Sequence, residues 1–251
     1  MPPAEGGKKG RRLPLIVGGA AVAGLLLIGG GVFVSGMLRD DSSEAGNASA
    51  SPAQTPTAAP SPTQPVLEPV KLKSRTTDPN PLTLKEAFGK SKFTASKKKY
   101  ERTAWNHRRS CTGVVSGTKL TSAIKKGGCS QVLRATYARG DGVLVGTVGV
   151  FNLETEEAAK AAEKAAAAKN AFLEPLKGKG DSKTIGRGEA LGTAEAQGHY
   201  LVMTWVQRPD GKKIASKYHS LVSTFGQQII RGSGLSVALH YRETEGKPYG
   251  S

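Results

Sequence analysis

The chain has 251 residues and a formal net charge of +16 at pH 7. Its composition changes so sharply along the chain that only about the last 170 residues can bury a hydrophobic core, which excludes two full-sized folded domains. Residues 85–139 hold 14 basic residues against two acidic ones. Because the positive charge is local, it is more informative about a binding surface than the total charge is.

Residues 13–38 form an uncharged apolar segment, LPLIVGGAAVAGLLLIGGGVFVSGML. This length exceeds the roughly 20 residues that a membrane-spanning helix needs. Basic residues precede the segment, and Arg39 is followed at once by Asp40 and Asp41. Since positive flanks stay inside, residues 1–12 are predicted to be a cytoplasmic tail, and the rest of the chain to lie outside the cell membrane.

A cleaved signal peptide is the alternative, because Ala48-Ser49-Ala50 has the form of a cleavage site. The apolar core of a signal peptide spans only about 7 to 15 residues, however, so we expect a retained single span.

Residues 39–81 are predicted to be a disordered linker. They are rich in Ser, Thr, Ala and Pro, and eight of the 14 prolines fall between Pro52 and Pro81. Such a segment buries too little apolar surface to offset the entropy of ordering. Extended at about 3.1 Å per residue, it could reach on the order of 130 Å.

Residues 82–247 are predicted to form the extracytoplasmic domain, followed by a tail at 248–251. A short helix is expected at 83–88, then one or two strands in the basic stretch that contains Tyr100 and Trp105. The spacing of Leu120 and Ile124 predicts a helix behind Thr118 as its cap, which Gly127-Gly128 ends. The two cysteines, Cys111 and Cys129, are predicted to form a disulfide outside the membrane; two buried thiols are the alternative.

The clearest hairpin joins 131–139 to 143–151 across Gly140-Asp141-Gly142. A helix follows behind Thr155, with eight alanines between positions 158 and 168. Strands at 194–197 and 200–207, a turn at 208–211 and a helix at 217–230 repeat the plan. This order predicts an α+β domain, an antiparallel sheet with helices packed on one face.

No catalytic, metal or cofactor signature is found. Gly89-Lys90-Ser91 and Lys183-Thr184 lack the glycines of a phosphate-binding loop, and no serine has glycine two positions away on both sides. The four histidines show no helical ligand spacing, so structural roles are expected for them.

The remaining candidates are basic and aromatic. Trp205 alternates with Leu201 and Met203 along a strand and is expected in the core. Trp105 is the candidate for an exposed aromatic among cations. The predicted ligand-binding residues are Lys97, Lys98, Lys99, Trp105, Arg108 and Arg109; a solvated lysine-rich face is the alternative.

The segments CTGVVSG and GGCSQVLRATYARGDGVLVGTVGVFNLET, with GHYLVMTWVQRPDGKK, resemble uncharacterised membrane-anchored extracytoplasmic proteins of actinobacteria. The resemblance covers most of residues 82–247 and implies no known activity. The layout is also distantly similar to the sensor halves of actinobacterial receptor kinases, but with only about 12 residues before the predicted span, no kinase is expected on the inside.

The sequence therefore favours a noncatalytic, sensor-like binding module of the cell envelope. Its expected partners are the membrane, an anionic lipid or cell-wall polymer, or a membrane protein; nucleic acid is not expected, because the domain is predicted to be exported. The alternatives are an envelope hydrolase with an unrecognised carboxylate site, and a structural accessory subunit of a membrane complex.

Overall fold

The computed structural model of the protein describes residues 71–250. The predicted tail, span and most of the predicted linker lie outside the described residues. Between residues 71 and 250, no helix is both long and apolar enough to cross a membrane.

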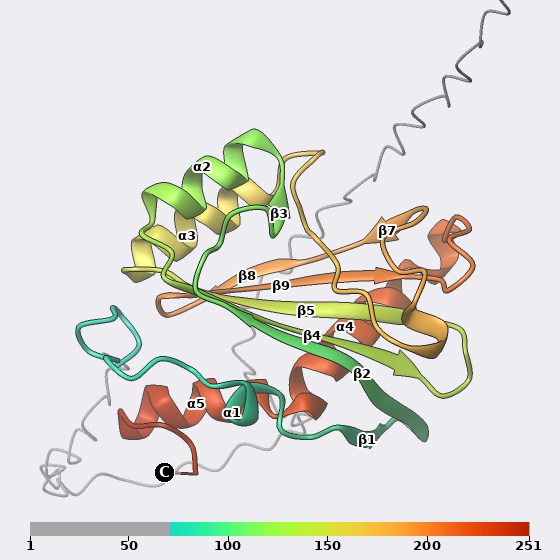
Figure 1. The fold of residues 1–251 in the computed structure, drawn as a ribbon, viewed down its shortest axis with the longest axis horizontal. Coiled ribbons are helices and arrows are strands. Elements are labelled where there is room, and N and C mark those ends of the chain that lie inside the picture. Colours follow the sequence, from blue (N-terminus) through green and yellow to red (C-terminus); the bar gives the residue numbers. More distant parts are fainter. Residues whose placement is uncertain (1–70, 251) are drawn as a thin grey trace, which may run out of the picture. The chain divides into compact units, whose positions relative to one another are not determined.

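The described chain folds into an α+β domain (Figure 1). Every strand that was expected is present. One or two strands were expected in the basic stretch, and the structure has two. The elements in chain order are α1 (Leu84–Phe88), β1 (Lys92–Ala95), β2 (Lys98–Arg108), β3 (Val115–Ser116), α2 (Thr118–Lys126), β4 (Gln131–Arg139), β5 (Val145–Asn152), α3 (Glu156–Ala166), β6 (Phe172–Leu173), the 3-10 turn η1 (Gly180–Ser182), β7 (Ala190–Leu191), β8 (Ala194–Gln197), β9 (Tyr200–Gln207), the 3-10 turn η2 (Ser216–Tyr218), α4 (His219–Ser233) and α5 (Leu235–Glu245).

The main sheet has seven strands in the order β1-β2-β4-β5-β9-β7, and β8 pairs beside β7 along the same edge of β9. All of its pairings are antiparallel. The predicted hairpin is confirmed as β4–β5, with Gln131 opposite Asn152 and Ala138 opposite Val145. A bulge in β2 between Arg102 and Ala104 shifts its register against β4.

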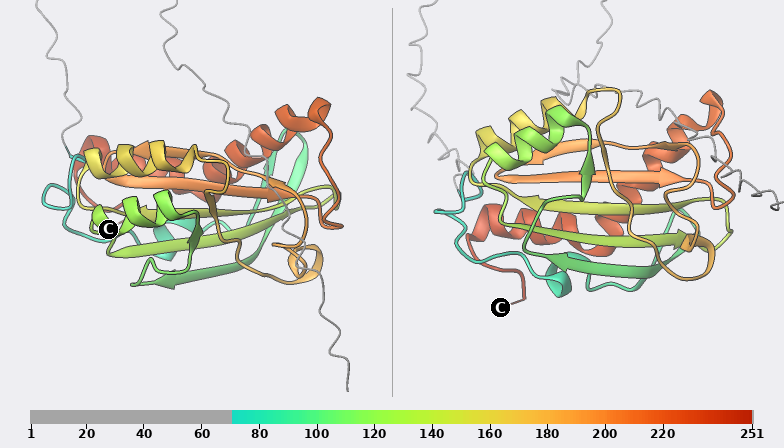
Figure 2. Two further views of the ribbon diagram at one scale, coloured as in Figure 1. Left: turned by 90° about the horizontal axis from the view of Figure 1, so that it is seen from above. Right: turned by 45° about the horizontal axis from the view of Figure 1, so that its top comes forward.

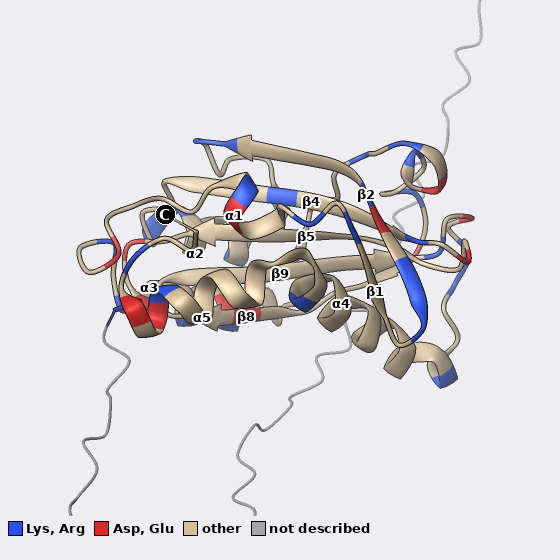
Figure 3. Ribbon diagram, turned by 90° about the horizontal axis from the view of Figure 1, so that it is seen from below, with Lys and Arg blue, Asp and Glu red and all other residues tan. Residues whose placement is uncertain are grey.

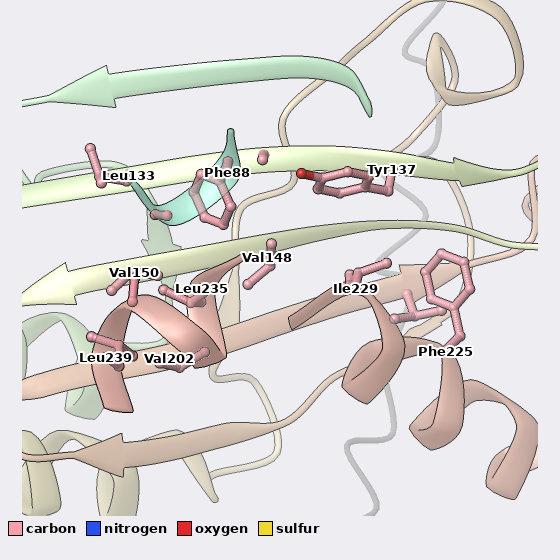
Figure 4. Packing of buried hydrophobic residues seen from close by; sticks show 14 of the residues in the cluster. Phe88, Leu133, Tyr137, Val148, Val150, Val202, Phe225, Ile229, Leu235 and Leu239 are labelled. Carbon is pink, nitrogen blue, oxygen red and sulfur yellow. The ribbon is translucent and has the colours of Figure 1, made fainter. Parts of the chain in front are cut away.

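Helices cover both faces of the sheet, so the prediction of helices on one face is wrong (Figure 2). One apolar cluster joins α1, α4 and α5 to residues such as Leu133 and Val148 (Figure 4). The second joins α2, α3 and the small β3–β6 pair to residues such as Phe151 and Met203. The reason is that β5 and β9 are buried at every position, and such strands need cover on both sides.

Two glycines of β5 allow these layers to approach the sheet. A Cβ at Gly146 would lie 2.7 Å from Phe225 of α4, and a Cβ at Gly149 would lie 2.8 Å from Leu173 of β6. Both distances are shorter than van der Waals contact, so a side chain at either position would push a covering layer away.

The folded domain extends past both predicted boundaries. Leu72 and Asp78, which were assigned to the linker, are buried, and the backbone N–H of His199 donates to the carbonyl of Leu72 at 2.7 Å. At the other end, the N–H of Tyr249 donates to Glu86 Oε1 at 3.0 Å. Residues 71–81 and 248–250 therefore belong to the domain, because long-range polar contacts that the local composition does not reveal hold them.

One of the two predicted helix caps is confirmed: the hydroxyl of Thr155 accepts from a backbone N–H in the first turn of α3. Thr83, which was expected to lie inside the first short helix, caps α1 in the same way. Thr118 is instead the first residue of α2, and Gly117 takes the cap position with a φ of 94°. A Cβ at Gly117 would lie 2.9 Å from Cα of Ala171, so close packing and the positive φ together require glycine there.

Candidate functional site

Strand β2 separates the predicted binding residues into two groups. Lys97 lies in the turn from β1, and Lys98 and Lys99 are the first residues of β2, whereas Arg108 and Arg109 lie at its other end. At about 3.3 Å per residue, roughly 30 Å of strand separates the two groups. The structure therefore does not bring the five cations together into one patch. Arg108 and Arg109 instead lie beside the disulfide, which is confirmed between Cys111 and Cys129.

Trp105 lies between the two groups and is 44% exposed. The guanidinium of Arg102 sits 3.6 Å from the centre of its ring, and it also donates to the carbonyl of Phe88. One face of the indole is thus already occupied by a cation of the same strand. The core prediction for Trp205 is confirmed: it is buried, and its Nε1 donates to Gln207 at 3.0 Å.

The lysines at the start of β2 belong to a larger basic surface, which we call the basic end. It lies where β2 begins and β4 and β9 end, because the antiparallel registers bring those turns to one end of the sheet (Figure 3). Loops that are distant in the sequence contribute to it. Its ten exposed basic residues are Lys97, Lys98, Lys99, Lys179, Lys183, Arg187, Arg208, Lys212, Lys213 and Lys217.

Hydrogen bonds tie the loops of the basic end to one another. The N–H of Gly140 donates to the carbonyl of Lys99 at 2.8 Å, and the hydroxyl of Thr184 donates to the carbonyl of Pro209 at 2.8 Å. The buried amide of Gln207 accepts from the N–H of Gly186 at 2.7 Å and donates to the carbonyl of Arg187 at 3.1 Å. The cations are therefore carried on a fixed framework of loops.

Four carboxylates lie among these ten cations: Asp141, Asp181, Glu189 and Asp210. Asp141 pairs with Lys98 at 3.2 Å, and Asp210 pairs with Arg208 at 2.7 Å. The bond from Arg208 and the N–H of Lys212 lower the pKa of Asp210 to about 2. Within the described part of the chain, the other eight cations have no carboxylate within ion-pair distance. The basic end thus keeps an excess of positive charge in water.

A second charged cluster is buried between the first described residues and α5. Arg242 is fully buried; its Nη1 donates to Asp78 at 2.6 Å, and its Nε and Nη2 donate to Glu86 at 2.6 and 2.8 Å. Tyr200 donates its hydroxyl to Asp78 at 2.7 Å, and His199 Nε2 lies 3.2 Å from the same oxygen. These bonds engage all four carboxylate oxygens.

The pKa values of this buried cluster favour its charged form. Burial raises the pKa of Asp78, but the bonds from His199 and Tyr200 and the charge of Arg242 outweigh it and leave that pKa below 3.8. Burial alone would lower the pKa of Arg242, but the bond to Glu86 and the charges of both carboxylates raise it above its ordinary value. Asp78 and Glu86 are thus the counterions of Arg242, which donates hydrogen bonds to both carboxylates.

Two shallow depressions border α2. One is lined by Ser116, Thr118, Ser122 and their neighbours, and the other runs between α2 and α3 past Ala123, Ala158 and Ala161. No histidine or carboxylate lines either of them. Across residues 71–250, no three His, Cys, Asp or Glu side chains are grouped to hold a metal ion.

Local patterns predicted three members of the basic end and missed the other seven. Lys212 and Lys213 follow the predicted turn 208–211, and their placement depends on the β5–β9 pairing, which the sequence does not reveal.

No protein-family model, curated protein or solved structure matches the chain.

Proposed function

We propose that this protein is a noncatalytic binding module that recognises an anionic component of the cell envelope through the basic end. The observation that carries the proposal is the set of eight unpaired cations on fixed loops at one end of the described domain. Exposed cations that are held close together raise the local concentration of a polyanion and bind it through many weak contacts. Lysine suits this role because it is a mobile point charge rather than a shape-specific fork.

The proposal includes an extracytoplasmic location behind a single membrane span at residues 13–38. The sequence order of basic flank, apolar segment and acidic flank supports it. The disulfide between Cys111 and Cys129 supports an oxidising compartment as well. In that place the accessible polyanions are lipid head groups and wall polymers, whereas nucleic acid is remote.

The alternative of a hydrolase has no supporting observation, because the buried carboxylates Asp78 and Glu86 are both engaged by Arg242. For the alternative of an accessory subunit, the described residues offer no large apolar face that would mark a permanent interface.

The test is retention of the full chain, kept in solution by a non-ionic amphipol, on immobilised polyphosphate. The test variant changes Lys97, Lys99, Lys212 and Lys213 to Gln. The control variant removes the same amount of charge from exposed lysines of α2 and α3, by changing Lys119, Lys125, Lys126 and Lys164 to Gln.

The unmodified chain is expected to bind at low salt and to elute as salt rises, because exposed charges are screened over about 8 Å at physiological ionic strength. Each lysine near an anionic surface contributes about 1 kcal/mol, so the test variant should bind roughly two to three orders of magnitude more weakly. The control variant should stay close to the unmodified chain. Absence of retention at low salt, or an equal loss in both variants, would refute a localised site.

A further inference from the structure

The basic end also carries exposed apolar side chains. Val143 is 45% exposed in the turn between β4 and β5, Tyr218 is 49% exposed at the end of η2, and Leu221 is 37% exposed in the first turn of α4. They are three of the six large apolar side chains that are exposed in the described part of the chain. Single exposed apolar residues are ordinary on protein surfaces, so their shared location is the informative fact.

Tyr218 and Leu221 lie three positions apart at the start of α4, a spacing that places them on one side of the helix. Lys217 lies with its ammonium 5.1 Å from the centre of the Tyr218 ring. The turn with Val143 lies at the same end of the sheet, because Val145, just after this turn, is paired with Gln207, the last residue of β9, and the chain continues from there to Tyr218 and Leu221. The three apolar side chains thus lie at the same end of the sheet as the lysines.

This combination distinguishes between two kinds of anionic ligand. A water-soluble polymer such as polyphosphate offers charge but no apolar phase, so exposed valine, tyrosine and leucine contribute nothing to its binding. A bilayer surface offers both: head groups attract lysines, and the boundary below them accepts apolar and aromatic side chains. Tyrosine suits that depth because its ring is apolar and its hydroxyl remains in water.

We infer that the basic end docks onto an anionic lipid bilayer, with Val143, Tyr218 and Leu221 inserted among the head groups and the surrounding lysines bound to lipid phosphates. The inference rests on the proposed function, and it narrows the ligand from any polyanion to a lipid surface. The turn that carries Val143 is rigid. The backbone N–H of Val143 donates to Oδ1 of Asp141 at 3.3 Å, and Nε of Arg139 donates to the same oxygen at 2.7 Å. Docking therefore requires little reordering of this turn.

The test is flotation of the full chain, held in non-ionic amphipol, with two kinds of vesicle: phosphatidylcholine alone, and an equal mixture of phosphatidylcholine and phosphatidylglycerol. The apolar variant changes Val143, Tyr218 and Leu221 to Ser. The matched control changes Val237 and Tyr249, which are as exposed but lie on and after α5, to Ser. Retention of each chain on immobilised polyphosphate is measured in parallel.

The unmodified chain is expected to float only with the anionic vesicles and to keep part of that binding at salt concentrations that elute it from polyphosphate. The apolar variant should bind the anionic vesicles roughly tenfold more weakly or worse, because it no longer buries apolar surface in the bilayer. Its retention on polyphosphate should be unchanged, and the control should match the unmodified chain in both assays.

Two outcomes would overturn the inference, and they are distinguishable. If the apolar variant floats as well as the unmodified chain, charge alone binds the vesicles; the lipid-docking surface is then wrong while polyanion binding stands. If the unmodified chain binds neither vesicles nor polyphosphate at low salt, the proposed function fails together with the inference.

Discussion

Replacing Arg242 with Met tests the buried charge cluster that fixes the first described residues to the rest of the domain. The guanidinium is fully buried, makes three bonds to Asp78 and Glu86, and also donates to the carbonyl of Asn80 at 2.5 Å. Methionine fills much of the same volume without a charge. The two carboxylates would then face each other in the interior without their shared cation.

Removing one partner of a buried ion pair typically costs 3–5 kcal/mol, because the remaining charge stays desolvated. Here the lower part of that range is expected. Asp78 keeps its bonds from Tyr200 and His199, and Glu86 keeps the N–H of Tyr249. For a domain of about 180 residues, each kcal/mol shifts the midpoint of thermal unfolding by roughly 2–4 °C, so a loss on the order of 10 °C follows.

The measurement is urea unfolding of the full chain at pH 7, followed by circular dichroism. A second chain combines Arg242→Met with Asp78→Asn and Glu86→Gln, and it should recover much of the lost stability because no uncompensated charge remains inside. A loss below about 1 kcal/mol for the single variant would refute the reasoning, since it would mean that the cluster is open to water. An equally unstable triple variant would show that the loss comes from packing and not from charge.

Three further outcomes are expected. Cys129→Ser opens the disulfide to Cys111, which closes a separation of 18 residues, and should cost about 3 kcal/mol of stability and expose one reactive thiol per chain. Because the pKa of Asp78 is lowered below 3.8 on folding, it stabilises the fold above that pH, and this contribution is lost as pH falls through the folded value; acid titration of Asp78→Asn should show a shallower decline. Gly198→Ala should cost about 2 kcal/mol and speed proteolysis within 71–81, since its Cβ would lie 2.3 Å from the Leu72 carbonyl at a φ of +55°.

Where local patterns were strong, the fold could be predicted from the sequence. Gly140-Asp141-Gly142 between two β-rich runs predicts the β4–β5 hairpin, and Thr155 before an alanine-rich run predicts α3, because turn chemistry and capping act over a few residues. The second layer of helices was missed although a signal was present. The run Val143–Phe151 is almost continuously apolar, which indicates burial on both faces rather than one.

Long-range contacts could not be predicted from local patterns. Arg242 meets Asp78 across 164 positions, and nothing near either residue indicates the other. The same holds for the basic end: Lys97 and Lys213 share one end of the sheet only because β9 pairs with β5. Conversely, Arg108 follows Lys97 closely in the sequence, yet an extended strand places them far apart.

The most direct test of the basic end is a hydrogen-exchange map of the full chain with and without short soluble polyphosphate. The map locates the bound anion without any substitution. Added protection is expected in the turn at 96–99 and in the segment 208–218, and the segment 108–112 at the other end of β2 should be unchanged. Protection centred on Arg108 and Arg109, or spread evenly over the exposed lysines of α2 and α3, would contradict the account.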